Sequence, residues 1–240
     1  MVNAGVRHGR DAEIQALQAA NNVGTTTITS TFLATRGERL VLGKFRFSSQ
    51  DQRRAAFHAD MLGIAEIDAD NRIASITVFD LDDIDAAFEE LDARYLADEA
   101  AAYSRTWSVI ADAYKAVNRQ ELPTTTPDWV NIDHRRGIAF PPGGLKAYLH
   151  ATWDLFTPGM NIYIETVHRL TILGAVVTRV VKGTSREGFD AEWREIGLST
   201  VEGNSIIRSE LFDEADLGTA LASFDELDRP PQLEKSATRI

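Results

Sequence analysis

The chain has 240 residues, of which 44% are hydrophobic and 25% are charged, and its formal net charge at pH 7 is −11. A net negative charge of this size repels phosphate groups, and no long run of lysine or arginine offsets it, so we expect binding neither to nucleic acids nor to anionic membranes. The absence of cysteine excludes disulfides, thiolate metal sites and cysteine nucleophiles. No signal-peptide pattern and no run of about 18 apolar residues is found, which favours a soluble, cytoplasmic protein.

In the first part of the chain, segments rich in β-branched and aromatic residues predict four strands. Their ranges are 26–34, 40–47, 56–68 and 72–79. Apolar residues spaced by three and four, from Leu81 to Tyr95, then predict an amphipathic helix. Asp80 precedes this helix, and its carboxylate is expected to act as the N-cap.

The second part begins with a helix over 103–117, where aromatic and aliphatic residues keep the same spacing. A strand at 129–133 and a helix at 147–156 follow. Four more strands are predicted at 161–170, 175–182, 189–201 and 205–212. Glu202-Gly203-Asn204 indicates a tight hairpin turn between the last two strands, and Asp213 is expected to cap a closing helix.

Three blocks of the sequence recur in the same order. The matching segments are 78–87 with 211–220, 64–68 with 198–202, and 12–16 with 147–151. The offset in the best-matched block, from Asp80 to Asp213, is 133 residues. This repetition predicts a duplicated α+β unit with bounds 1–96 and 97–240, in which the first copy lacks its N-terminal helix and strand. An open strand edge invites another chain, so a homodimer through sheet packing or edge completion is expected.

The order of the predicted elements, together with the segment 129–137 (Trp-Val-Asn-Ile-Asp-His-Arg-Arg-Gly), resembles the nuclear transport factor 2-like superfamily, in particular its SnoaL-like branch. The resemblance implies tandem cone-shaped units, each a curved antiparallel sheet wrapped on helices around a ligand cavity. Tandem units of this kind are also similar to the C-terminal segments of large actinobacterial regulatory proteins. The superfamily contains cyclases, isomerases, hydrolases and non-enzymatic binders, so the resemblance does not fix one activity.

Ketosteroid isomerase, a member of that superfamily, implies a catalytic set in the second copy. Its general base would correspond to Asp133, its oxyanion tyrosine to Tyr114, and its protonated carboxylic acid to Glu195. A carboxylate in an apolar cavity has its charged form destabilised, which suits a general base. An arginine next in sequence could instead pair with Asp133, and each of the three residues has a structural alternative as a core, turn or solvent-facing residue.

Four further residues are candidate ligand contacts. Trp193 shares one predicted strand face with Glu195, and Trp153, His168 and His134 complete the set. A lone tryptophan or histidine on an apolar face is more often a core residue. Adjacent Asp133 and His134 point to opposite faces of a strand, so we expect no metal site, and without a phosphate-binding loop we expect no cofactor.

Two functions are consistent with these patterns. The first is binding of a small apolar molecule in the second copy, with enzymatic status open and cofactor-free acid–base catalysis of the isomerase, cyclase or hydrolase type as its extension. The second is a non-catalytic regulatory or dimerisation module of a signalling protein. Genomic neighbourhood would separate the two.

Overall fold

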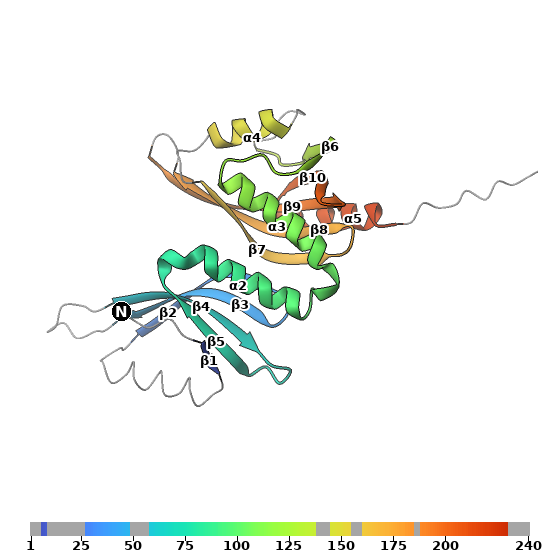
Figure 1. Cartoon of the computed structure of the whole chain (residues 1–240). Helices are drawn as coiled ribbons and strands as arrows, with labels where there is room; N and C mark the ends of the chain where they lie inside the picture. Colours follow the sequence, from blue (N-terminus) through green and yellow to red (C-terminus); the bar gives the residue numbers. More distant parts are fainter. Residues whose placement is uncertain are drawn as a thin grey trace, which may run out of the picture. The chain divides into compact units, whose positions relative to one another are not determined.

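A computed structural model describes residues 6–8, 27–48, 58–137, 145–154, 160–184 and 188–229 (Figure 1). The chain divides into two compact units, the first made of Met1–Ser104 with Ile164–Val167 and the second of Arg105–Tyr163 with His168–Ile240. Each unit is described by itself, and the strand that contains Ile164–Val167 is described with the sheet of the second. The domain bounds expected from the sequence, 1–96 and 97–240, remain predictions.

The first unit holds five strands and one α-helix within the described residues. The strands are β1 (Val6–His8), β2 (Thr27–Arg36), β3 (Leu40–Ser48), β4 (His58–Ile67) and β5 (Ile73–Phe79). The helical segments are η1 (Leu81–Asp83), α2 (Ile84–Ala97) and η2 (Ala101–Tyr103). The strand order in the sheet is β1-β5-β4-β3-β2, and every pairing is antiparallel. Helix α2 contacts β2, β3 and β4.

The second unit is built from a second five-stranded sheet. Its strands are β6 (Thr125–Asp133), β7 (Asn161–Leu170), β8 (Gly174–Thr184), β9 (Asp190–Glu202) and β10 (Ser205–Asp213). Its helical segments are α3 (Ser104–Asn118), α4 (Leu145–Asp154), η3 (Glu214–Asp216) and α5 (Leu217–Leu227). The strand order is β6-β10-β9-β8-β7.

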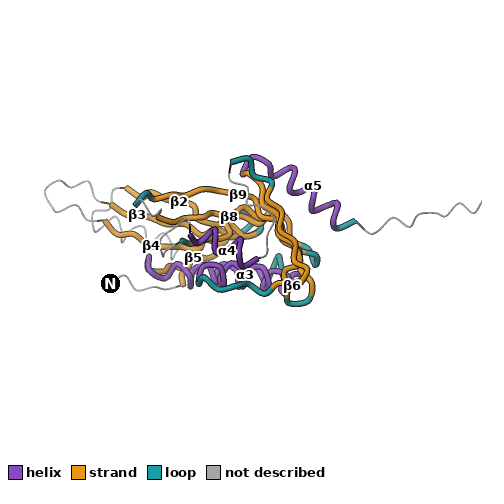
Figure 2. Tube along the Cα trace, turned by 90° about the horizontal axis from the view of Figure 1, so that it is seen from above, coloured by secondary structure: helices purple, strands orange, loops and turns teal. Residues whose placement is uncertain are grey.

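The helices of the second unit cover both faces of its sheet. Helix α5 packs on one face, where Phe224 joins the fully buried Ile196, Leu198 and Phe212. Figure 2 shows α3 and α4 on the other side of these strands. The α5 face is a dry apolar core, whereas the α3–α4 face contains the cavity described below.

The predicted elements agree well with those observed. Both sheets have the same strand order, and β5 and β10 occupy the same position in it, which the internal repeat predicts. An origin by duplication stays a prediction. The hairpin at Gly203 is confirmed, because β9 and β10 pair directly around it and Gly203 has φ +59°, a value that glycine adopts at little cost.

Three expectations about the strands and caps are corrected. The first sheet does not end at β5: the three-residue strand β1 pairs with β5 and covers that edge. The second sheet is not wholly antiparallel, because β6 runs parallel to β10. Asp80 and Asp213 do precede η1 and η3, but neither side chain makes a capping hydrogen bond.

The match of residues 12–16 to 147–151 falls outside the described residues. Among the helices that the structure describes, none has the length and apolar character required to cross a membrane.

Candidate functional site

The second unit contains a cavity of about 90 Å³ between α3, α4 and the sheet. Its walls are mainly apolar, with contributions from Ile110 and Leu149. Large polar residues also line it, among them Tyr114 from α3, Tyr148 from α4, Arg179 from β8 and Glu210 from β10. The cavity therefore combines an apolar enclosure with a few convergent polar groups, which is the usual composition of a small-molecule site.

Tyr114 reaches the sheet because of its helix position and a glycine opposite it. It follows Ile110 by four residues, so both side chains lie on the α3 face that packs toward the sheet. A Cβ atom added to Gly197 on β9 would lie 3.0 Å from the Tyr114 hydroxyl oxygen. The absence of a side chain at Gly197 thus permits the close approach of the phenol to the strand.

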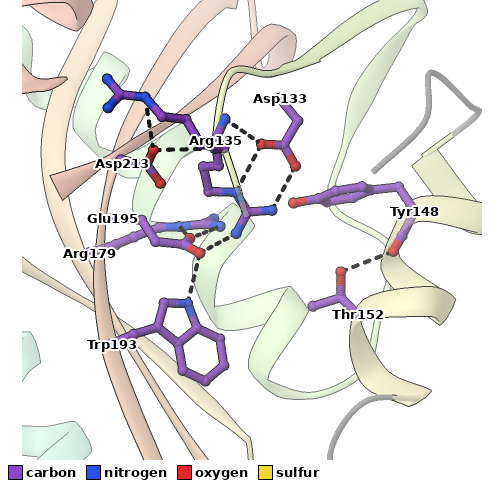
Figure 3. Close-up of polar contacts among 9 residues, drawn as sticks. Asp133, Arg135, Tyr148, Thr152, Arg179, Trp193, Glu195 and Asp213 are labelled. Atoms are coloured by element: carbon purple, nitrogen blue, oxygen red, sulfur yellow. Dashed lines mark hydrogen bonds and ion pairs between the residues drawn. The ribbon is translucent and has the colours of Figure 1, made fainter. Parts of the chain in front are cut away.

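Beside the cavity, four alternating charges form a connected chain across the sheet (Figure 3). Arg135 donates to both carboxylate oxygens of Asp133, from Nε at 2.9 Å and from Nη2 at 2.7 Å. The Nη1 of Arg135 donates to Glu195. Arg179 donates to the other oxygen of Glu195 from Nε at 2.8 Å and from Nη2 at 2.6 Å.

Two aromatic residues contact or face this chain of charges. The indole Nε1 of Trp193 donates to Glu195 Oε1 at 2.7 Å. Figure 3 shows the hydroxyl of Tyr148 pointing toward the Arg135 guanidinium and Asp133. The side chains of Asp133 and Glu195 are only 1% and 3% exposed, so the arginines compensate two carboxylates that are almost removed from water.

The electrostatics of the site keep its groups in fixed protonation states. Burial disfavours the carboxylate of Glu195, but Arg179 and Arg135 outweigh it and the pKa of Glu195 is lowered. Burial also opposes the charge of Arg179, yet its pKa is raised, chiefly by Glu195. Burial raises the pKa of the Tyr114 phenol, and the neighbouring Arg179 cation offsets this only in part. At neutral pH Tyr114 is therefore a hydrogen-bond donor beside a permanent cation.

Two of the proposed catalytic residues are ion-paired in the structure, and their catalytic roles stay predictions. Asp133 lies near Tyr148 and makes a bidentate ion pair with Arg135. This ion pair stabilises the charged form of the Asp133 carboxylate and opposes its uptake of a proton. Glu195 accepts hydrogen bonds from Arg135, Arg179 and Trp193, so it is not the protonated donor that the resemblance implied. Among the three predicted residues, Tyr114 alone lines the cavity.

The four predicted ligand contacts are Trp193, Trp153, His168 and His134. None of them belongs to the described residues that line the cavity. Trp193 holds Glu195, as described above. Trp153 donates from Nε1 to the backbone oxygen of Val117 at 3.2 Å and packs beside Ile162. It therefore attaches α4 to α3, rather than facing a ligand.

The two histidines have partners elsewhere. His168 lies 2.7 Å from the hydroxyl of Thr178, and burial lowers its pKa. His134 stacks on Phe212 at 4.3 Å, and its Nε2 lies 2.7 Å from a carboxylate oxygen of Glu210. Neither geometry places an imidazole in the cavity.

Sequence reasoning missed Arg179, Tyr148 and Gly197. A signal for Arg179 was present, because a lone arginine interrupts the valine-rich segment 175–181, and a charge within a buried strand requires a partner. No comparable signal distinguished Tyr148 from other tyrosines. In the part of the chain that the structure describes, no group of three or more His, Asp or Glu side chains could hold a metal ion.

No protein-family model matches the sequence, and no curated protein matches it. Among solved structures, a SnoaL-like candidate polyketide cyclase from Jannaschia sp. CCS1 covers 54% of the chain and 96% of its own length, with 17% identity and a TM-score of 0.36. TerC, crystallised with polyporic acid, covers 52% of the chain and 98% of its own length, with 18% identity and a TM-score of 0.39.

A third solved structure, the Δ5-3-ketosteroid isomerase from Mycobacterium sp., covers 47% of the chain and 95% of its own length, with 16% identity and a TM-score of 0.37. The SnoaL-like resemblance expected from the sequence is thus found again among solved structures. Each match covers about one unit of the chain. At these identities and scores the likeness carries no argument about activity, which has to come from the residues of the chain itself.

Proposed function

We propose that the second unit is a small-molecule-binding domain, in which Tyr114 and Arg179 hold an oxygen atom of the ligand. The observation that supports this most strongly is the presence of both side chains on the wall of one mainly apolar cavity. Both groups are donors, since the pKa values of the phenol and of the guanidinium are raised. The ligand atom between them is therefore an acceptor, such as a carbonyl, hydroxyl or phenolate oxygen.

The surroundings of Arg179 prepare it for this role. Two of its nitrogens are fixed by Glu195, and Glu195 is itself held by Arg135 and Trp193. A donor whose orientation is set before binding loses little conformational entropy when the ligand arrives. The alternating charge chain thus supports a preorganised polar end of the cavity.

The volume limits the ligand to a small one. A cavity of about 90 Å³ is below the roughly 150 Å³ of a cavity known to admit benzene and below the roughly 300–1,000 Å³ of drug-sized sites. A single six-membered ring therefore already requires an outward shift of side chains such as Tyr148.

Cofactor-free acid–base catalysis of the isomerase, cyclase or hydrolase type is a finer proposal for the same site. Tyr114 would stabilise negative charge that develops on the ligand oxygen. Asp133 could act as a base only if Arg135 released it. Binding is therefore the function that the geometry supports best, and catalysis is secondary to it.

Calorimetric titration of the full chain with phenol tests the binding proposal, with toluene as the probe that lacks the oxygen. We expect phenol to bind more tightly than toluene, and Tyr114→Phe to weaken phenol about two- to tenfold, as loss of one hydrogen bond implies. Tyr103→Phe, which lies outside the cavity, is the matched control. Equal affinities for phenol and toluene, or an unchanged phenol affinity in Tyr114→Phe, would contradict the proposal.

A further inference from the structure

A second group of polar side chains lines the same cavity, away from the charge chain. Asn131 on β6 lies directly opposite Ser209 on β10, and Ser209 lies directly opposite Ser199 on β9. Directly paired residues share one face of a sheet, and all three line the cavity. They form a polar row across three strands.

The polar row has hydrogen-bond donors and acceptors that are not all used within the protein. The hydroxyl oxygen of Ser209 accepts from Trp129 Nε1 at 3.2 Å, which leaves the Ser209 hydroxyl hydrogen to donate. Within the described residues, the amide of Asn131 and the hydroxyl of Ser199 have no side-chain hydrogen bond. These side chains are half-buried and line the cavity, so their polar atoms are available to polar atoms of a molecule in it.

The row lies about one ring away from the Tyr114 hydroxyl. That hydroxyl sits over Gly197, and Ser199 is two residues further along the same strand face. Two residues of a strand span about 6.6 Å. Gly197 and its cross-strand partner Leu211 form the apolar row next to the polar row on this face of the sheet, and Leu211 also lines the cavity.

The first unit shows that the sheet does not require the polar row. At the equivalent cross-strand position, Ala65 and Ile76 stand where the second unit has Ser199 and Ser209. The same strands form with the same order in both units. The serines therefore contribute nothing that the sheet itself needs.

The charged row differs between the units in the same way. The pair Arg179–Glu195 of the second unit is replaced by Phe45–Met61 at the equivalent position of the first. The glycine between the rows is kept, as Gly63 in the first unit and Gly197 in the second. The Ser199–Ser209 pair and the Arg179–Glu195 pair thus occur together in the second unit, and the corresponding pairs of the first unit are both apolar, which is expected if the two polar pairs serve one ligand.

We propose that the cavity of the second unit takes a ring compound with oxygen functions on two opposite sides. One oxygen is held by Tyr114 and Arg179, and the other by Asn131, Ser199 and Ser209. This inference rests on the proposed binding function and adds the second contact and the chemical class of the ligand.

The test compares phenol with hydroquinone, its analogue with a second oxygen on the opposite side of the ring, by calorimetric titration of the full chain under argon. Hydroquinone should bind about fivefold or more tightly than phenol, since it gains at least one hydrogen bond. The double variant Asn131→Ala/Ser199→Ala should remove this preference, so that it binds hydroquinone no more tightly than it binds phenol. Ser205→Ala, on β10 but outside the cavity, is the control.

The outcomes separate the two proposals. Equal binding of phenol and hydroquinone, or a preference that survives the double variant, overturns the second contact and leaves the binding function intact. Failure of both compounds to bind overturns the binding function and this inference with it. Resorcinol, whose second oxygen is not on the opposite side of the ring from the first, should bind no more tightly than phenol. If resorcinol bound as tightly as hydroquinone, the assigned geometry would be overturned, even if the double variant were poorly folded.

Discussion

Replacing Arg135 with methionine tests the charge chain that supports the site. Arg135 contacts the buried carboxylates of both Asp133 and Glu195, through two side-chain hydrogen bonds to Asp133 and one to Glu195. Methionine keeps much of the aliphatic volume of the side chain and removes the charge. Glu195 retains Arg179 and Trp193 in the variant, so most of the loss falls on Asp133.

The expected cost follows from the burial of the two carboxylates. Removing one partner of a buried ion pair typically costs about 3–5 kcal/mol, because the remaining charge is left uncompensated. Since Glu195 keeps two of its donors, we expect a value near the lower end, about 3 kcal/mol. Arg136→Met is the control: Arg136 is 78% exposed, pairs with Asp216 at 3.0 Å, and should cost less than about 1 kcal/mol.

Urea unfolding followed by tryptophan fluorescence measures this cost in the second unit. The four tryptophans, Trp107, Trp129, Trp153 and Trp193, all follow the division of the chain at Ser104. The double variant Asp133→Asn/Arg135→Met should recover a large part of the loss, because the buried charge is removed with its partner. If Arg135→Met is no less stable than Arg136→Met, the charge chain does not stabilise the site and the reasoning is refuted.

Three further outcomes are expected. Gly197→Ala should lower stability by about 1–3 kcal/mol and weaken phenol binding, because the new Cβ would lie 3.0 Å from the Tyr114 hydroxyl. Gly218→Ala is the control and should not destabilise the protein, because a Cβ there meets nothing within 4 Å. Equal effects of the two variants in unfolding experiments would contradict this. In the folded state the pKa of Glu195 is lowered from its ordinary value of 4.5. Glu195 therefore adds stability above pH 4.5, and this stability is lost as the pH falls through the lower folded pKa. In Glu195→Gln, the free energy of unfolding should fall less between about pH 7 and pH 3 than it does in the unaltered protein. Phe224→Ala, at a fully buried position of α5, should cost about 3–5 kcal/mol, and a cost below about 1 kcal/mol in urea unfolding would mean that α5 does not complete the core.

Periodicity and the internal repeat made much of the fold predictable. The strands around Gly203 and the helix from Leu81 followed from local patterns, because alternation and three–four spacing report directly on which face is buried. The parallel pairing of β6 with β10 was not readable, since a strand's own residues do not specify its partner. Strand β1 was missed because three residues, Val6–His8, carry too little pattern.

The site was predictable in its residue types and not in their pairing. Tyr114 was expected at a cavity from the resemblance to ketosteroid isomerase, whereas its apolar helix stripe by itself indicates a core residue; in the structure it lines the cavity. Asp133 was expected as the base and Glu195 as the acid, and the structure links the two through Arg135. The competing outcome was visible in the sequence, because Arg135 follows Asp133 by only two residues, just beyond the end of β6. Long-range partners such as Arg179 depend on sheet register, which a single sequence does not provide.

A crystal structure of the full chain soaked with phenol tests the central claim most directly. The account predicts density for one ring between α3, α4 and the sheet, with the phenol oxygen within hydrogen-bond distance of Tyr114 Oη and an Arg179 nitrogen. Phenol bound at another place in the second unit, with the cavity free of it, would contradict the claim that Tyr114 and Arg179 form the oxygen-binding end of a ligand site.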